Sequence, residues 1–152
     1  MHDVTGLIGK TDLLREIISL SSVGRVIPMD GEYNLSLIPL TESVRNKLFA
    51  ASSDKQVLDF NYLNESELSQ LSIMSTHGTL MYFETDYFGG VGGQGAGVFK
   101  NGSCVFGPDW AETGAINRAL TWLGVETDTD GQDGFDKIGL YKHRNTDRWM
   151  AS

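Results

Sequence analysis

The sequence has few cysteines and histidines and no long apolar run, and each shortage excludes a class of protein. Cys104 is the only cysteine in 152 residues, so no internal disulfide can form. The three histidines lie far apart and provide no short metal-binding motif. No apolar stretch approaches the roughly 20 residues that cross a bilayer, so we expect no membrane association. The N-terminus also lacks the pattern of a secretory signal, which favours a cytoplasmic protein.

Basic residues are scarce as well. Twelve lysines and arginines stand against 20 acidic residues, which gives a formal net charge of −8. Such a field repels nucleic acid and anionic lipid and attracts basic proteins, so nucleic-acid binding is not expected. Plain solubility is the alternative explanation of the same charge.

Length and patterning predict one α+β domain over residues 1–152, with a mainly antiparallel sheet and about four helices packed against it. Asn64 and Glu67 form a capping-box pattern for one of these helices. The four predicted helices cover residues 12–21 with Thr11 as cap, 41–51, 65–73, and a segment capped by Asp109 and Glu112 that ends at Gly124. A short additional helical segment is expected over 134–138.

Alternating apolar residues predict the strands. A hairpin is expected from 25–29 and 33–38, and Pro28 places its first strand at a sheet edge. Asn101-Gly102 predicts a two-residue turn that sets Phe99 opposite Cys104 and Val98 opposite Val105, with Cys104 in the core. The other predicted strands cover residues 56–62, 79–88, 95–100 and 103–106.

Glycine is abundant in one place only, with six in the nine residues 89–97. Such density indicates a backbone that needs positive φ or close approach by another group. The run contains G-x-G-x-x-G, but a hairpin follows where a dinucleotide site requires a helix, so no cofactor is expected. A plain glycine turn or bulge between strands is the simpler interpretation.

The strand before these glycines carries the candidate site. Its two-residue period places Tyr82, Glu84, Asp86 and Phe88 on one side and Tyr87 on the other. Neighbouring carboxylates can act as an acid/base pair, hold a cation, or receive a partner's arginine or lysine. A second acidic segment, 126–131, is similar to the start of a calcium loop, but Lys137 stands where the bidentate glutamate is needed, so no metal is expected.

The motif 84–90 followed by Gln94, the hairpin, and the leucine-rich helix ending at 123–125 together carry a resemblance. Over residues 80–144 the chain resembles small acidic bacterial immunity proteins of polymorphic and contact-dependent toxin systems. The resemblance implies a non-enzymatic inhibitor that binds a basic toxin domain. The partner-binding residues that it implies are Tyr82, Glu84, Asp86, Tyr87, Phe88, Gly89, Gly90 and Gln94.

Two other classes stay open from the residues themselves. Glu84 and Asp86 are compatible with a small hydrolase or transferase, which requires a pocket beside the glycines and a carboxylate with a raised pKa. Alternatively, the glycine run shapes a small-molecule cleft or a homodimer contact in a ligand-binding or assembly module. The sequence leaves the oligomeric state open.

Overall fold

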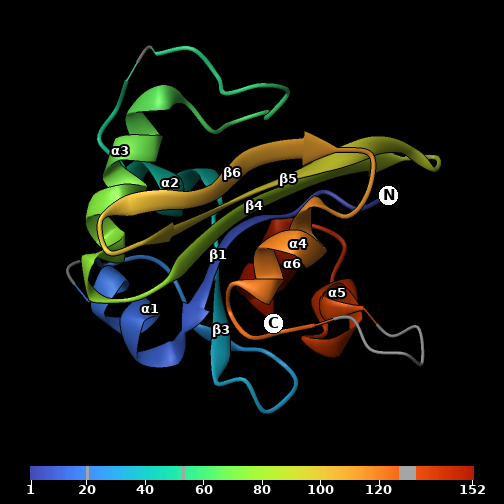
Figure 1. The fold of residues 1–152 in the computed structure, drawn as a ribbon, viewed down its shortest axis with the longest axis horizontal. Coiled ribbons are helices and arrows are strands. Elements are labelled where there is room, and N and C mark those ends of the chain that lie inside the picture. The colour runs from blue at the N-terminus through green and yellow to red at the C-terminus, as the bar shows by residue number, and fades with distance from the viewer. Residues whose placement is uncertain (20, 53, 127–132) are drawn as a thin grey trace.

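The fold is built on a six-stranded, fully antiparallel sheet with the strand order β2-β3-β1-β4-β5-β6 (Figure 1). The computed structural model describes residues 1–19, 21–52, 54–126 and 133–152. The predicted α+β class is confirmed, and four of the described α-helices have seven residues or more. The strands are β1 (Thr5–Lys10), β2 (Ile27–Pro28), β3 (Leu35–Pro39), β4 (Leu80–Phe88), β5 (Val91–Lys100) and β6 (Ser103–Ala111). The helices are α1 (Thr11–Ile18), α2 (Glu42–Leu48), α3 (Glu65–Met74), η1 (Ser75–His77), α4 (Ala115–Thr121), α5 (Gly134–Lys137), η2 (Leu140–Lys142) and α6 (Thr146–Ala151).

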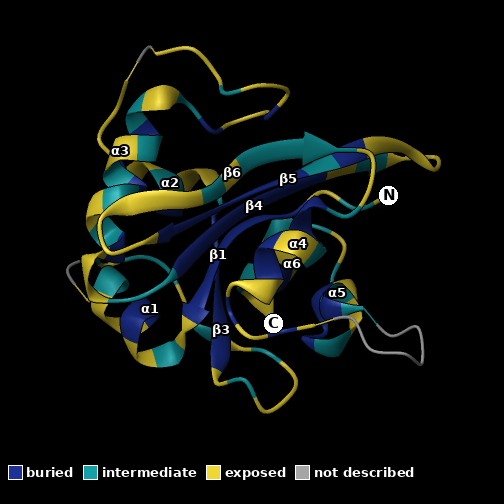
Figure 2. Ribbon diagram, in the orientation of Figure 1, coloured by how far each residue is buried: buried dark blue, intermediate teal, exposed yellow. Residues whose placement is uncertain are grey.

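Helices cover both faces of this sheet, so the described residues form two apolar cores. Met81 and Phe83 of β4 face α4 and α6, whereas Leu80 and Tyr82 face α1, α2 and α3. The alternation predicted for this strand is thus present, with both of its faces buried near its start. Figure 2 shows the buried strands at the centre and the exposed residues on the outer sides of the helices.

The central strand, β1, was not predicted from the sequence. It pairs with β3 on one side and with β4 on the other. Residues 5–9 are all buried, so the strand has no polar alternation to reveal it. Gly6 also weakens the prediction of a strand, because glycine has a low β propensity. A Cβ at Gly6 would lie 2.6 Å from Leu37 Cδ1, which explains why a glycine fits there.

Helix ends agree with the sequence where a side chain caps them. Both capping-box hydrogen bonds of Asn64 and Glu67 are present, and Thr41 accepts from the Val44 N–H. Thr11, in contrast, lies inside α1 and its hydroxyl bonds Ser36, so its predicted capping role is wrong. α1 and α2 are also shorter than predicted.

The helix α4 begins later than the predicted Asp109 and Glu112 cap. Its N-cap position is Gly114, with φ of +89°. Asp109 belongs to β6 and pairs with Arg118 at 2.8 Å. Gly124 follows the helix end as predicted, and the short helix near 134–138 is α5.

The predicted strand over residues 56–62 is wrong, because this segment is a compact loop. The Val57 N–H donates to the Leu63 carbonyl at 2.8 Å, and Leu58 has a φ of +48°. Inward-facing Phe60 and Leu63 are buried, which accounts for the apolar pattern that favoured a strand. We call residues 57–63 the anchored loop.

The glycine run forms one tight turn and then a strand. Gly89 and Gly90 make the turn with φ of +60° and +81°, and the later glycines belong to β5. A Cβ on Gly95 would lie 2.5 Å from ring carbons of both Phe60 and Trp110, so these two rings rest directly on the backbone of the sheet.

The β5–β6 hairpin turns at Asn101 and Gly102 as predicted, and Phe99 pairs with Cys104. A register shift then sets Val98 opposite Phe106, so the expected pairing with Val105 is wrong. Cys104 is exposed on the edge strand, which corrects its assignment to the core.

Candidate functional site

The side chains predicted for partner binding divide between the interior and the surface. Tyr82 and Glu84 are 0% and 1% exposed because α2, α3 and the anchored loop cover their face of β4. Asp86 lies on the same face and is exposed, and its carboxylate accepts the side-chain amide of Asn61 in the anchored loop at 2.9 Å. The expectation that Tyr82 and Glu84 face a partner is therefore wrong.

Glu84 is instead the hydrogen-bond acceptor that holds the anchored loop. Its carboxylate accepts the backbone N–H groups of Asn61, Tyr62 and Leu63 at 2.7, 3.2 and 3.0 Å, and the Tyr82 hydroxyl at 2.6 Å. Burial raises the pKa of Glu84, and these hydrogen bonds oppose the rise. With its oxygens engaged inside the protein, Glu84 has no free face for a substrate.

Arg45 continues this network to α3. Its guanidinium pairs with Glu67 at 2.7 Å and donates to the Tyr82 hydroxyl. It also lies 5.4 Å from the ring centre of Tyr62 and 5.3 Å from that of Tyr82. No local pattern of residues indicates this arrangement, because the partners come from α2, α3, β4 and the anchored loop.

The end of the β4–β5 hairpin is the exposed part of the predicted site. Phe88 and Val91 pair across the turn and are 75% and 77% exposed. The turn glycines Gly89 and Gly90 are exposed as well, and the hairpin end projects from the sheet (Figures 1 and 2). Together with Asp86 these residues form a surface that we call the hairpin tip.

Tyr87 and Gln94 connect the hairpin to the start of α4. Gln94 donates through Nε2 to the Tyr87 hydroxyl at 3.0 Å and accepts the Ile116 N–H at 2.7 Å. The Tyr87 hydroxyl donates to the Glu112 carbonyl. These two predicted site residues thus hold the hairpin in place.

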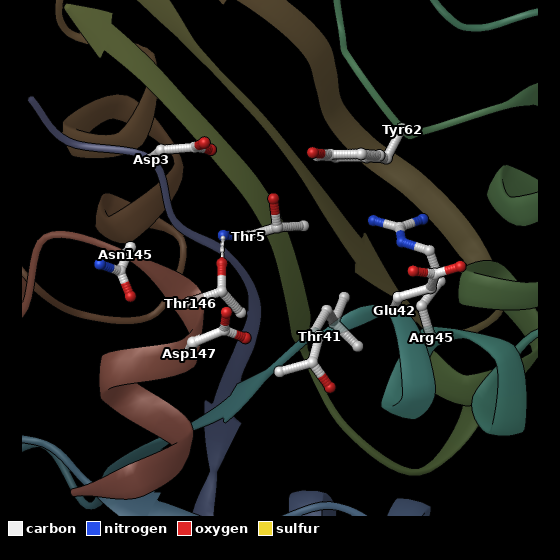
Figure 3. A pocket seen from close by; sticks show the side chains of 10 residues that line it. Asp3, Thr5, Thr41, Glu42, Arg45, Tyr62, Asn145, Thr146 and Asp147 are labelled. Carbon is white, nitrogen blue, oxygen red and sulfur yellow. Dashed lines mark hydrogen bonds between the residues drawn. The ribbon is translucent and has the colours of Figure 1, made fainter.

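A polar cleft of about 520 Å³ lies between Asp3 and Tyr62 (Figure 3). Its walls are the N-terminal segment with Asp3, the start of α2 with Glu42, the start of α6 with Asp147, and Tyr62 of the anchored loop. Sequence reasoning missed the cleft, since its residues come from four separate segments and no local motif marks them.

Electrostatic repulsion is concentrated at this cleft. Burial and the nearby Asp86 carboxylate raise the pKa of Asp3. Burial, followed by Asp3 and Glu84, raises the pKa of Tyr62. None of Asp3, Glu42, Asp86 and Asp147 forms an ion pair with a described residue.

The described residues contain neither a cluster of metal-binding side chains nor a membrane-spanning helix. Within them, no three His, Cys, Asp or Glu side chains are grouped to hold a metal ion. In the same part of the chain, no helix is both long and apolar enough to cross a bilayer. The acidic segment 126–131 falls, from residue 127 onward, outside the described residues.

Comparisons with family models, characterised proteins and solved structures found no match to this chain. Its function is therefore inferred from the geometry of its own surface.

Proposed function

We propose that this chain is a non-enzymatic binding protein that docks its hairpin tip on a basic protein, as an immunity protein of the cytoplasm does on a toxin domain. The observation that carries this proposal is the exposed pair Phe88 and Val91, 75% and 77% accessible at the end of a hydrogen-bonded ladder. Large apolar side chains on a fixed backbone are effective interface anchors because little conformational entropy is lost on binding.

Charge complements this apolar pair. Asp86 lies two residues from Phe88 on the same strand, and the whole chain carries a formal charge of −8. Acidic groups around an apolar centre steer a basic partner and raise its association rate. The turn glycines add no side chains, so a partner's backbone can approach the tip closely.

The alternative of a hydrolase or transferase that uses Glu84 and Asp86 has less support. The pKa of Glu84 is raised, as that alternative requires, but the carboxylate is buried and binds the anchored loop. With Glu84 buried, Asp86 lacks the second carboxylate that this alternative requires at the substrate.

Affinity capture from the source cells tests the proposal. Phe88→Ser/Val91→Ser removes the apolar pair, and Ile73→Ser, at a 70% exposed position of α3, is the matched control. We expect one basic protein to be captured by the wild type and the control and lost with the tip variant. With the purified partner, the tip variant should weaken binding by about 30-fold or more.

The inhibitor role is tested by expressing the captured protein in bacteria. We expect growth arrest that co-expression of the wild-type chain relieves and the tip variant does not. Capture of the same proteins by wild type and tip variant would contradict the proposal.

A further inference from the structure

We propose that the cleft between Asp3 and Tyr62 binds the positively charged end of a ligand, an alkylammonium or guanidinium group. This site is distinct from the hairpin tip, and the inference does not depend on the tip binding a protein. It rests on the shape of the cleft, the charges at its rim and one hydroxyl without a protein partner on its floor.

The floor of the cleft holds a polar group without a partner. Thr5 is 3% exposed, yet its hydroxyl forms no hydrogen bond with any described residue. Its backbone N–H donates to the Thr146 hydroxyl at 3.0 Å, which fixes β1 against α6. Figure 3 shows the Thr5 hydroxyl directed into the space between the Asp3 carboxylate and the Tyr62 hydroxyl. Among the described residues, Trp149 Nε1 is the one fully buried side-chain polar atom without a partner, so the Thr5 hydroxyl is reached from the cleft. It offers a ligand an oxygen that accepts N–H groups.

The rim of the cleft determines the sign of the ligand's charge. Asp3, Glu42 and Asp147 contribute three carboxylates, and all three are exposed without an ion pair among the described residues. Among the described residues that line the cleft, Arg45 is the one cation, and it is already bound to Glu67. An anion is therefore repelled, whereas a cation with N–H donors meets carboxylate and hydroxyl acceptors.

The size of the cleft suits an organic cation. A volume of about 520 Å³ is within the usual range of small-molecule sites, and Tyr62 supplies an aromatic wall for the ligand's carbon chain. The described residues offer no metal-binding group of three ligands, which argues against a bare metal ion as the occupant.

Titration of the ¹⁵N-labelled protein with 1,4-diaminobutane, followed by NMR, tests this inference. We expect saturable shifts of the Asp3, Thr5 and Tyr62 amides that weaken as ionic strength rises. Butane-1,4-diol, which has the same length and no charge, should leave these amides unshifted. N-acetyl-lysine methylamide, tested in parallel, presents the same ammonium group as a protein side chain. Tighter binding of the lysine derivative than of the diamine would identify a partner's lysine side chain as the source of the ammonium group. Tighter binding of the diamine would identify a free amine.

Matched variants locate the binding. Asp3→Asn/Asp147→Asn should raise the dissociation constant about tenfold or more, and Thr5→Val should also weaken binding. Asp12→Asn/Glu32→Gln removes the same charge from exposed positions near the other end of β1 and should leave affinity unchanged. Phe88→Ser/Val91→Ser should retain amine binding, which separates this site from the hairpin tip.

The inference is overturned if neither amine shifts the cleft amides. It is overturned equally if the diol shifts them as much, or if Asp3→Asn/Asp147→Asn binds the amines as tightly as the wild type does.

Discussion

Glu84 shows how one buried side chain replaces secondary structure. The anchored loop has no strand partner for the N–H groups of residues 61–63, and the carboxylate supplies their acceptor. Because the carboxylate satisfies these backbone N–H groups, the loop can pack Phe60 and Leu63 into the core.

We expect Glu84→Ala to lower the free energy of unfolding by about 3 kcal/mol, because it leaves buried N–H groups without an acceptor. Urea denaturation measures this change. Asp86→Ala, on the same strand but exposed, should change stability by no more than about 0.5 kcal/mol. Equal stability of Glu84→Ala and the wild type would show that the anchored loop is held by other contacts.

His2 gives the fold a dependence on pH. Its Nδ1 lies 2.7 Å from the Thr85 hydroxyl, and its ring lies 5.4 Å from that of Phe135. Burial lowers the pKa of His2 below its usual 6.5, with Arg144 acting in the same direction, so the folded state favours the neutral ring.

The stability that depends on neutral His2 is present above pH 6.5 and is lost as the pH falls through the lower pKa of the folded state. We therefore expect His2→Gln to show a smaller loss of stability on acidification than the wild type. Urea midpoints across the acidic range measure the difference, and His77→Gln at an exposed helix end is the control. Identical pH profiles for His2→Gln and the wild type would exclude this role.

At the scale of the elements, the absence of a side chain at Gly95 lets two aromatic rings pack directly on the backbone of β5. Phe60 and Trp110 meet edge to face with ring centres 5.3 Å apart above Gly95. The glycine density that indicated a binding loop thus has a packing explanation in this part of the strand.

We expect Gly95→Ala to lower the free energy of unfolding by about 1–3 kcal/mol, since a methyl group there overlaps both rings. Gly97→Ala in the same strand is the control, because its Cβ would meet no atom closer than 3.5 Å and should be tolerated. Denaturant unfolding and the Trp110 fluorescence maximum measure both variants. A stable Gly95→Ala protein with unchanged fluorescence would contradict this packing role.

The elements that sequence predicted correctly are those with local signals. The capping box at Asn64, the edge proline Pro28 and the Asn101-Gly102 turn each determine their own backbone geometry. Periodicity also placed Glu84 and Asp86 on one face of β4, but it carried no information about which part of that face a distant loop covers. β1 and the cleft depend on long-range packing, so no local pattern revealed them.

At the scale of the whole molecule, the sheet is shared by two apolar cores. Phe83 is buried among α4 and α6 on one face, and Leu71 of α3 is buried on the other. Because β1 and β4 contribute side chains to both cores, loss of either core removes the support of the other.

We expect Phe83→Ala and Leu71→Ala each to lower the free energy of unfolding by about 3 kcal/mol or more. Both variants should still unfold in a single transition, coincident by far-ultraviolet circular dichroism and tryptophan fluorescence. Separate transitions for the two probes would show that the cores unfold independently.

The central position of β1 also has a consequence for how the protein is made. β1 is synthesised before its neighbours β3 and β4, which belong to later parts of the chain. An open strand edge invites association with other chains, so the nascent protein carries this hazard until β4 has emerged. Once β4 covers the second edge of β1, β5 and β6 lie further along the chain and extend the sheet outward from β4.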